Sequence, residues 1–161
     1  MIYIGSDHRG FALKEKFKSL LTEWGYDYKD LGPFEYNKDD DYPDFATAVA
    51  TAVARDLLAV SESNPSKGEQ SRGILICGSG VGVAMTADKI KGVRAGTMFD
   101  VEQVKASVAD EDTNVIGLSH DYSSEEKNIA IAKAFLESKF SGEERHVRRI
   151  GKIKKLEDVQ Y

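Results

Sequence analysis

The sequence predicts a single α/β domain of the Rossmann-like, three-layer kind, with a five-stranded parallel sheet between layers of helices. Short apolar segments alternate with longer segments of helical periodicity, which is typical of βαβ units. Ile74, Leu75 and Ile76 form an unbroken apolar run that suits a strand buried on both faces. The 161 residues are enough for one compact domain with a full core, and too few to suggest two.

The first 58 residues contain two strands and two helices. Residues 2–4 form the first expected strand, and a polar turn at 5–10 leads into a helix over residues 11–24, where apolar residues repeat at helical spacing. Residues 26–31 form the second strand, closed by Gly32 and Pro33. Pro43 suits the first turn of the next helix, which runs through Leu58 and whose many alanines imply close packing.

The remaining elements repeat the pattern. Residues 61–71 lack apolar side chains and are expected to form a surface loop. The central strand at 74–76 precedes a helix that includes Met85 and Ile90 and ends at Gly92. Strands at 94–99 and 114–118 alternate with helices at 101–109 and 129–136. The tail, residues 143–161, is an amphipathic basic helix that either covers its own domain or docks on a second subunit.

The bulk composition limits the class of protein. A hydrophobic content of 41% with 30% charged residues is ordinary for a soluble globular protein, and a net charge of −5 argues against general nucleic-acid affinity. One cysteine excludes an internal disulfide and fits a reducing compartment. The sequence shows neither a basic, apolar leader nor a run of roughly 20 apolar residues. We therefore expect a cytoplasmic protein.

A glycine-rich turn, Cys77-Gly-Ser-Gly-Val-Gly82, joins the central strand to its helix. The first N–H groups of a helix have no partner within it and carry the positive end of its dipole, so they favour an anion or a developing oxyanion. The same field favours the thiolate at Cys77 and makes it a candidate base or nucleophile. The alternative is that Cys77 is a small buried hydrophobe and the glycines only permit tight packing.

Several known glycine motifs are excluded by spacing. A dinucleotide fingerprint requires glycine, and a Cys-x5-Arg phosphatase requires arginine, at the position where Val83 stands. The Gly-Lys-Ser/Thr triplet of nucleotide-hydrolase phosphate loops is missing after the turn. The turn is therefore predicted to hold a small anion rather than a nucleotide.

Other polar residues follow neighbouring strands. In open parallel sheets, sites form at the carboxyl ends of strands where the chain direction reverses. Asp7 and His8 follow the first strand, so they would converge with Cys77 if the first and third strands are adjacent, and Tyr42 could close the pocket. Taken singly, Asp7 could instead cap the following helix and His8 could be a surface histidine.

Five motifs together carry a family resemblance. They are Gly5-Ser-Asp-His-Arg-Gly-Phe11, Asp41-Tyr-Pro43, Gly73-Ile-Leu-Ile-Cys-Gly-Ser-Gly-Val-Gly82, Asp112-Thr-Asn-Val115 and Arg145-His-x-x-Arg149. In this order and rough spacing they resemble the ribose-5-phosphate isomerase B family, which includes the subunits of galactose-6-phosphate isomerase. The resemblance covers residues 1–153 without the loop at 61–71.

The resemblance implies aldose–ketose interconversion of a phosphorylated sugar through an enediolate, without metal or organic cofactor. Cys77 would move the proton between C1 and C2, assisted by Ser79. Asp7 would bind sugar hydroxyls or help ring opening. The oxyanion would be held by the amides of Gly78, Gly80, Val81 and Gly82. Asn114 would lie beside the sugar-facing loop. The phosphate would be bound by His8, Arg145 and Arg149.

The resemblance also implies a dimer, or a dimer of dimers, with an active site shared between subunits and phosphate ligands partly from the second subunit. The two arginines lie four residues apart and therefore share one helix face. Their guanidinium groups suit phosphate. Without the other motifs, the same pattern describes a solvated basic face of a helix.

Two positions depart from the family pattern. Asp110-Glu111 stands where most ribose-5-phosphate isomerases of this type have histidine and asparagine, and that histidine is credited with opening the furanose ring. A carboxylate at neutral pH accepts a proton but has none to donate, so Asp110 would have to act differently. His120-Asp121 stands where the family often has an arginine for the phosphate, which weakens an anion site.

The leading hypothesis is an isomerase of ribose 5-phosphate and ribulose 5-phosphate. One alternative is an isomerase of galactose 6-phosphate or another hexose phosphate, since one galactose-6-phosphate isomerase subunit type also has an acidic residue at the histidine position. A second alternative is a non-catalytic companion subunit that binds a sugar phosphate. Retention of Cys77 favours an enzyme, because simple binding needs no base there.

Overall fold

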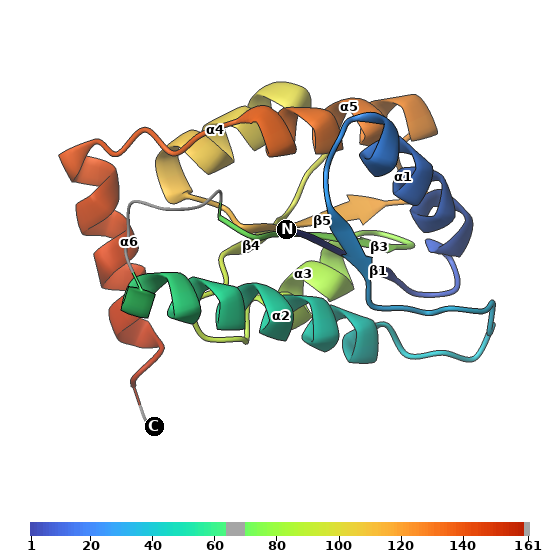
Figure 1. The fold of residues 1–161 in the computed structure, drawn as a ribbon, viewed down its shortest axis with the longest axis horizontal. Helices are drawn as coiled ribbons and strands as arrows, with labels where there is room; N and C mark the ends of the chain where they lie inside the picture. Colours follow the sequence, from blue (N-terminus) through green and yellow to red (C-terminus); the bar gives the residue numbers. More distant parts are fainter. Residues whose placement is uncertain (64–69, 160–161) are drawn as a thin grey trace.

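A parallel five-stranded sheet, in the order β2-β1-β3-β5-β4, forms the centre of the computed structural model, which describes residues 1–63 and 70–159 (Figure 1). This confirms the predicted fold class. The strands are β1 (Ile2–Ser6), β2 (Tyr28–Asp30), β3 (Arg72–Cys77), β4 (Ala95–Thr97) and β5 (Val115–Ser119). The helices are α1 (Phe11–Glu23), α2 (Tyr42–Ser63), α3 (Val81–Ala87), α4 (Val101–Glu111), α5 (Glu125–Glu137) and α6 (Glu144–Leu156).

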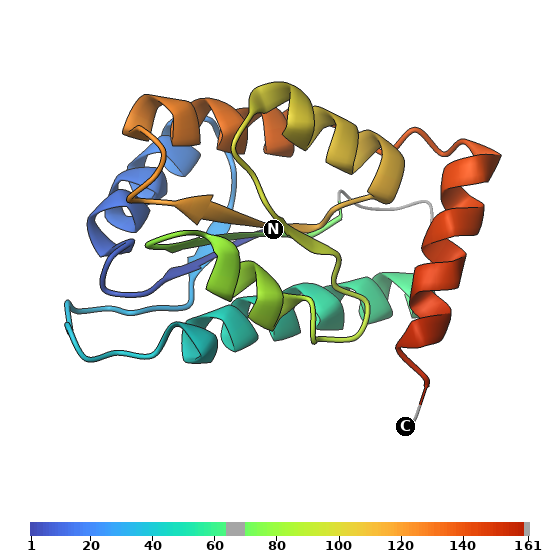
Figure 2. The same ribbon diagram turned by 180° about the vertical axis from the view of Figure 1, so that it is seen from behind.

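The helices cover both faces of the sheet. Helices α1, α4 and α5 lie on one face and α2 and α3 on the other, while α6 stands at the side in both views (Figures 1 and 2). Alternate residues of the strands supply the two layers. Ile74 and Ile76 of β3 pack with α1, α4 and α5, whereas Leu75 and Cys77 pack with α2 and α3. The period of two in a strand therefore directs the Cys77 thiol toward the α2–α3 layer.

Several element boundaries differ from those predicted. Helix α2 extends through Ser63, so residues 61–63 are helical rather than loop, because no glycine or proline interrupts the chain before Pro65. The predicted loop residues 64–69 lie outside the described residues. Helix α3 has seven residues and ends at Ala87, because Lys89, Ile90 and Val93 bond back three residues in successive turns. The second and fourth strands are each limited to three residues.

Helix α6 contacts its own chain at the end of the sheet where the strands begin. Its C-terminal end is tied there by the Gly92 N–H, which donates to Glu157 Oε1 at 2.9 Å, and by the Lys91–Asp158 ion pair. Val147, Ile153 and Leu156 of α6 remain exposed. The prediction that the tail also docks on a second subunit stays a prediction.

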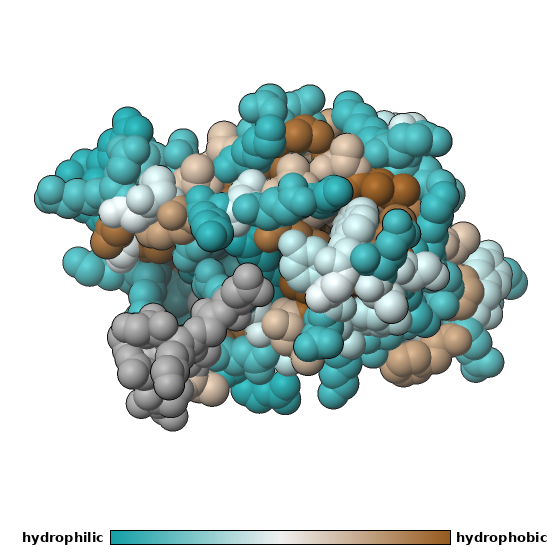
Figure 3. Space-filling model, turned by 45° about the horizontal axis from the view of Figure 1, so that its top comes forward, coloured by the Kyte–Doolittle hydropathy of each residue, from teal (hydrophilic) through white to brown (hydrophobic). Residues whose placement is uncertain are grey.

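The surface over α1, α4 and α5 is mostly hydrophilic, with a few small hydrophobic patches (Figure 3). Across the described residues we find no helix with the length and apolar character that a membrane span requires.

Candidate active site

Strands β1 and β3 lie side by side at the centre of the sheet, as the site prediction required. They pair in parallel from Ile2 opposite Arg72 to Ser6 opposite Ile76. From β1 the chain proceeds outward to β2 and then returns to β3 on the other side, so its direction reverses between β1 and β3. The Asp7 N–H donates to Ile76 O at 3.1 Å. The segments that follow the two strands are therefore adjacent at the carboxyl edge of the sheet.

The Cys77 thiol lies at the entrance of the glycine turn and is almost buried, with 4% of the residue exposed. The Gly80 N–H donates to Cys77 Sγ at 3.1 Å, so a backbone amide of the turn points at the sulfur. Gly80 adopts φ +75°, and a Cβ there would lie 2.9 Å from the carbonyl carbon of Leu118. Position 80 therefore requires glycine, both for its backbone conformation and for space.

Two side chains from the neighbouring strands hold this turn in place. Ser119 Oγ donates to Gly78 O at 2.8 Å, and Thr97 Oγ1 donates to Gly80 O at 3.1 Å. Within the turn, the Val81 N–H donates to Ser79 Oγ at 3.2 Å. The amides of Gly80 and Val81 thus have partners inside the turn, whereas both had been predicted to bind the oxyanion. Because α3 has only seven residues, the individual amides matter more here than a helix dipole.

Asp7 lies beside this turn and is 5% exposed. Its Oδ1 accepts a hydrogen bond from the Gly10 N–H at 3.0 Å, which closes the turn before α1; Gly10 is itself the N-cap of that helix and the cap has no side-chain hydrogen bond, so Asp7 holds the turn rather than capping the helix. Burial raises the pKa of the Asp7 carboxyl, and the Gly10 hydrogen bond offsets only part of that effect. A buried carboxyl with a raised pKa is also a candidate for proton exchange with a substrate. The two roles are therefore compatible.

His8 is fixed by a partner that the sequence did not single out. Its ring Nδ1 lies 2.6 Å from Asp40 Oδ1, and its backbone N–H donates to the same oxygen at 3.0 Å. Asp40 is nearly buried, with 6% of its side chain exposed, whereas His8 is 27% exposed. A carboxylate on Nδ1 leaves Nε2 for a ligand. The acidic run 39–41 was the only sequence signal for Asp40.

Tyr42 also reaches the glycine turn. A Cβ placed on Gly82 would lie 2.8 Å from two carbon atoms of the Tyr42 ring, so the ring packs directly on the Gly82 backbone. Tyr42 is the first residue of α2 and is 40% exposed. The structure therefore brings Tyr42 to the same carboxyl edge of the sheet as Cys77, Ser79, Asp7 and His8.

An ion pair covers the other side of the turn. Arg9 Nη2 lies 2.5 Å from Asp121 Oδ2, and both side chains approach Gly78, where a Cβ would meet Asp121 Oδ2 at 2.8 Å. His120 Nδ1 lies 3.1 Å from the other oxygen of Asp121. The Asp121 carboxylate is therefore compensated by Arg9, a residue that sequence reasoning missed. Its signal was its position between His8 and Gly10 in the first motif.

Asp110 and Asn114 lie at the opposite edge of the sheet, where the strands begin. Asp110 is in the last turn of α4, and Asn114 immediately precedes β5. Asn114 is 1% exposed. Its Oδ1 accepts from the Arg94 N–H at 2.9 Å and its Nδ2 donates to Gly92 O at 3.0 Å. Because both of its polar atoms join the α3–β4 connection to β5, we no longer assign Asn114 to the substrate.

Arg145 and Arg149 also lie away from the glycine turn of their own chain. Both are exposed on α6, and Arg145 Nε donates to Glu143 Oε2 at 2.8 Å. A single chain therefore does not bring these arginines, or Asp110, together with Cys77. The sequence could have shown this separation for Asp110 and Asn114, because residues before a parallel strand lie at the edge opposite to residues after it.

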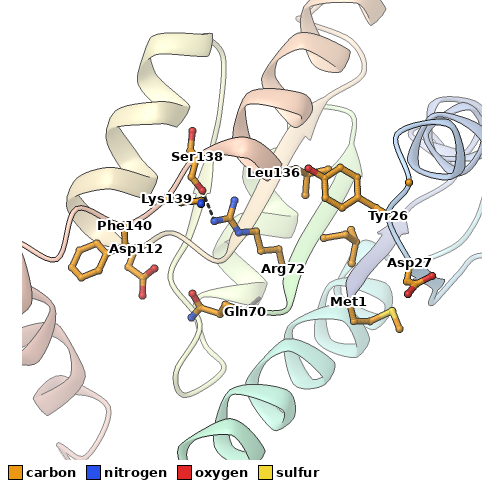
Figure 4. A pocket seen from close by; sticks show the side chains of 12 residues that line it. Met1, Tyr26, Asp27, Gln70, Arg72, Asp112, Leu136, Ser138, Lys139 and Phe140 are labelled. Carbon is orange, nitrogen blue, oxygen red and sulfur yellow. Dashed lines mark hydrogen bonds between the residues drawn. The ribbon is translucent and has the colours of Figure 1, made fainter. Parts of the chain in front are cut away.

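A cavity of about 380 Å³ at the amino edge contains none of the predicted site residues (Figure 4). It is lined by Met1, Ile2, Gly25, Tyr26, Asp27, Gln70, Arg72, Asp112, Leu136, Ser138, Lys139 and Phe140. The guanidinium group of Arg72, which lines this cavity, donates to Phe135 O and, at 2.6 Å, to Ser138 O. Arg72 therefore satisfies carbonyl groups at the end of α5, which is a structural task. Within the described ranges, no three histidine, cysteine or carboxylate side chains are grouped so as to hold a metal ion.

The order of the strands, the glycine turn and the residues at the strand ends fit the class of sugar-phosphate isomerases. The chain belongs to the ribose/galactose isomerase family, whose model matches residues 2–153. It is 40% identical to the probable ribose-5-phosphate isomerase B of Mycoplasma pneumoniae, over 94% of this chain and 91% of that protein. It is 34% identical to the ribose-5-phosphate isomerase B of Mycolicibacterium paratuberculosis, over 92% and 86% of the respective chains.

Solved structures agree with the sequence comparison. The crystal structure of ribose-5-phosphate isomerase B from Mycoplasma genitalium with bound ribulose 5-phosphate superimposes with a TM-score of 0.88 and 37% identity, over 99% of this chain and 97% of that one. The enzyme from Clostridium thermocellum gives a TM-score of 0.83 and 34% identity, over 97% and 96%. The resemblance inferred from the five motifs is thereby confirmed.

Proposed function

We propose that this protein is an aldose–ketose isomerase that interconverts ribose 5-phosphate and ribulose 5-phosphate, a reaction of pentose phosphate metabolism. The observation that carries the proposal is the pairing of Cys77 with the glycine turn beside Asp7, in a chain of this family. The ribulose 5-phosphate bound to the Mycoplasma genitalium relative supports a pentose rather than a hexose.

Cys77 is the base that moves the proton. A hydrogen beside a carbonyl group is weakly acidic, so its removal needs a nearby base and stabilisation of the oxygen that becomes negative. The thiolate of Cys77 takes the proton from C2 of the open-chain aldose and returns it to C1. The amides of Gly78, Ser79 and Gly82 hold the enediolate oxygen, because those of Gly80 and Val81 already have partners. Ser79 Oγ is placed to assist proton movement between the two oxygens.

The complete site is shared by two copies of the chain. One copy supplies the residues at the carboxyl edge of its sheet, which are Asp7, His8, Tyr42 and Cys77. The other supplies Asp110 and the guanidinium groups of Arg145 and Arg149 from its amino edge. The separation of these groups within one chain supports this arrangement, as do the exposed apolar residues of α6. Arg9, which is paired with Asp121, adds a cation at the same carboxyl edge.

We also place the protein in the cytoplasm. The proposed base requires a free thiol, and thiols remain reduced in that compartment. The reaction as proposed needs neither a metal ion nor an organic cofactor, because proton transfer and oxyanion stabilisation use only side chains and amides of the chain.

Replacing Cys77 with alanine tests the base. We expect kcat/KM for ribose 5-phosphate to fall about 10³-fold, with an unchanged unfolding transition, because a methyl group cannot accept the proton. A wild-type protein that converts no pentose or hexose phosphate but binds one saturably would favour a companion binding subunit. Turnover unaffected by Cys77→Ala would refute the mechanism.

Mixing two inactive variants tests the shared site. Cys77→Ala and Arg149→Ala each damage a different edge, so a hybrid dimer has one doubly damaged site and one intact site. Random exchange of subunits is expected to restore about a quarter of the wild-type sites. Hybrid dimers that form, as native mass spectrometry can establish, but remain inactive would contradict sharing.

A further inference from the structure

His146 is a buried imidazole without a hydrogen bond. It lies in the first turn of α6, is 1% exposed, and both of its ring nitrogens are enclosed with no hydrogen-bond partner in the part of the chain that the structure describes. Buried polar nitrogens are normally bonded, because an unpaired one has lost its hydrogen bonds to water without replacement. An enclosed imidazole in this state is therefore expected to have a task beyond packing.

Two carboxylates approach the same nitrogen of this ring. Asp110 Oδ1, from α4, lies 3.6 Å from His146 Nε2, and Glu143 Oε2, from the segment before α6, lies 3.8 Å away. Both distances slightly exceed a normal hydrogen bond, so a small movement would complete either one. Because both carboxylates approach Nε2, a proton carried on that nitrogen is directed at a carboxylate.

The two carboxylates are not equivalent. Glu143 also accepts a hydrogen bond from Arg145 Nε at 2.8 Å, so an arginine competes for its charge. Asp110 has 48% of its side chain exposed, whereas the His146 side chain is 2% exposed. Glu143, with 55% of its side chain exposed, is at least as accessible, so the competing Arg145 is what distinguishes Asp110 as the partner of the imidazole.

The backbone holds this arrangement in place. The Ser141 N–H donates to Ala109 O at 3.0 Å, which fixes the segment before α6 against the last turn of α4. The His146 N–H donates to Glu143 O at 2.9 Å. The position of His146 beside Asp110 is thus set by the fold rather than by a flexible side chain.

We propose that His146, acting through Asp110, supplies the proton that opens the furanose ring of the aldose substrate. The inference rests on the proposed function and its shared site. Ring opening breaks the bond between C1 and the ring oxygen O4. The Asp7 carboxylate of the other copy takes the proton from the hydroxyl on C1, Asp110 gives a proton to O4, and C1 becomes the aldehyde. Asp110 receives that proton from His146 Nε2. Exchange with solvent later removes the proton from Asp7 and returns one to His146 through the exposed Asp110.

This pair answers a chemical difficulty at position 110. A carboxylate alone has no proton to donate at neutral pH, whereas imidazole binds and releases protons in that range. The imidazole is enclosed and cannot touch the sugar, so His146 is a positioning and proton-supplying residue, and Asp110 is the catalytic residue. The family resemblance implies a histidine at position 110, and in this chain His146 of α6 supplies an imidazole beside that position.

Two assays separate ring opening from the isomerisation itself. Conversion of ribose 5-phosphate requires ring opening and enolisation. Ribulose 5-phosphate has its O5 esterified and so forms no furanose ring, which means that exchange of its C1 hydrogen with solvent deuterium reports enolisation alone. In His146→Gln we expect ribose 5-phosphate turnover to fall about 10²-fold, while exchange into ribulose 5-phosphate, followed by NMR, is retained.

A rescue variant and a control sharpen the test. Asp110→His placed in the His146→Gln chain returns an imidazole to the exposed position and is expected to recover turnover. Lys105→Gln, on the outer side of α4 where Lys105 pairs with Glu102, is expected to change neither assay. Parallel loss of turnover and exchange in His146→Gln would show that His146 is only structural, and unchanged turnover would equally overturn the proposal. Wild-type protein without turnover and without exchange would instead overturn the proposed function, and this inference with it.

Discussion

Two carboxylates at the ends of neighbouring strands have opposite surroundings: Asp7, which follows β1, is buried, and Asp30, which ends β2, is partly buried, with 11% of its side chain exposed. Asp30 ends β2 and receives Lys14 Nζ at 2.6 Å, Lys18 Nζ at 3.1 Å and the Gly32 N–H at 2.9 Å. Asp7 follows β1 and receives the Gly10 N–H. Burial acts to raise the pKa of both. The ammonium groups and the Gly32 amide reverse the effect at Asp30, so the pKa of Asp30 is lowered while that of Asp7 is raised.

The difference separates a stabilising carboxylate from a reactive one. The charged form of Asp30 is favoured by folding, and Asp30 joins α1 to the edge strand through the fully buried Lys14. The charged form of Asp7 is disfavoured by folding, a cost that is common where a group must exchange protons with a substrate. Similar positions at the same edge of the sheet thus serve different purposes, because their partners differ.

Removing the buried ammonium group is expected to have the largest effect on stability. Lys14→Met leaves the partly buried Asp30 with only Lys18 and the Gly32 amide, so the free energy of unfolding should fall by about 3 kcal/mol, the lower end for breaking a buried pair. Urea unfolding measures it, and turnover per folded molecule should be unchanged. Lys16→Met on the same helix is the control. It breaks only the surface pair with Glu125 and should cost less than about 1 kcal/mol. Equal losses in the two variants would contradict the comparison.

Neutralising the other carboxylate should reverse the sign of the effect on stability. Asp7→Asn keeps an oxygen for the Gly10 N–H and removes a buried charge, so the midpoint of thermal unfolding at pH 7 should rise. The same change should lower kcat/KM for ribose 5-phosphate about 10²-fold, because the amide cannot accept the hydroxyl proton. A less stable Asp7→Asn protein, or one with full activity, would show that Asp7 serves only to hold the turn before α1.

The pH dependence of these changes provides the smallest but most specific test. The stabilising effect of Asp7→Asn should shrink as pH falls through the raised pKa of Asp7 and vanish below its ordinary value of 3.8, where both states of the wild-type carboxyl are protonated. The penalty of Lys14→Met should disappear only at a lower pH, once the pH falls through the lowered folded pKa of Asp30, because the wild-type carboxylate keeps its charge beside Lys14 until then. Unfolding midpoints measured from neutral to acidic pH test both trends. Parallel pH profiles for the two variants would contradict the assignment.

Local patterns predicted much of what the structure contains. The alternation of apolar runs with helical periodicity located every strand and helix, because burial on a strand or helix face imposes a short repeat on the sequence. The glycine turn after Cys77 was equally visible, since φ +75° at Gly80 restricts that position to glycine. The ends of the helices and strands were predicted less accurately than their presence. Helix α3 ends at Ala87 rather than beyond Ile90, where successive tight turns replace the helix.

Partners distant in sequence could not be predicted in the same way. Nothing in the sequence near His8 indicates Asp40, and nothing near Arg9 indicates Asp121, because each pair joins loops that only the order of the strands brings together. Asn114 has the composition of a site residue but is used to connect Gly92 and Arg94 to β5.

The sequence alone determined the class of fold, the thiol at the end of the central strand and the family, because these depend on residue types at short, fixed spacings. Only the tertiary structure decided which polar groups meet. It placed Asp7 beside Cys77, Arg9 against Asp121 and His146 beside Asp110. The physical reason is that hydrogen bonds and ion pairs act over a few ångströms in space, and the sheet order sets those distances for residues far apart in the chain.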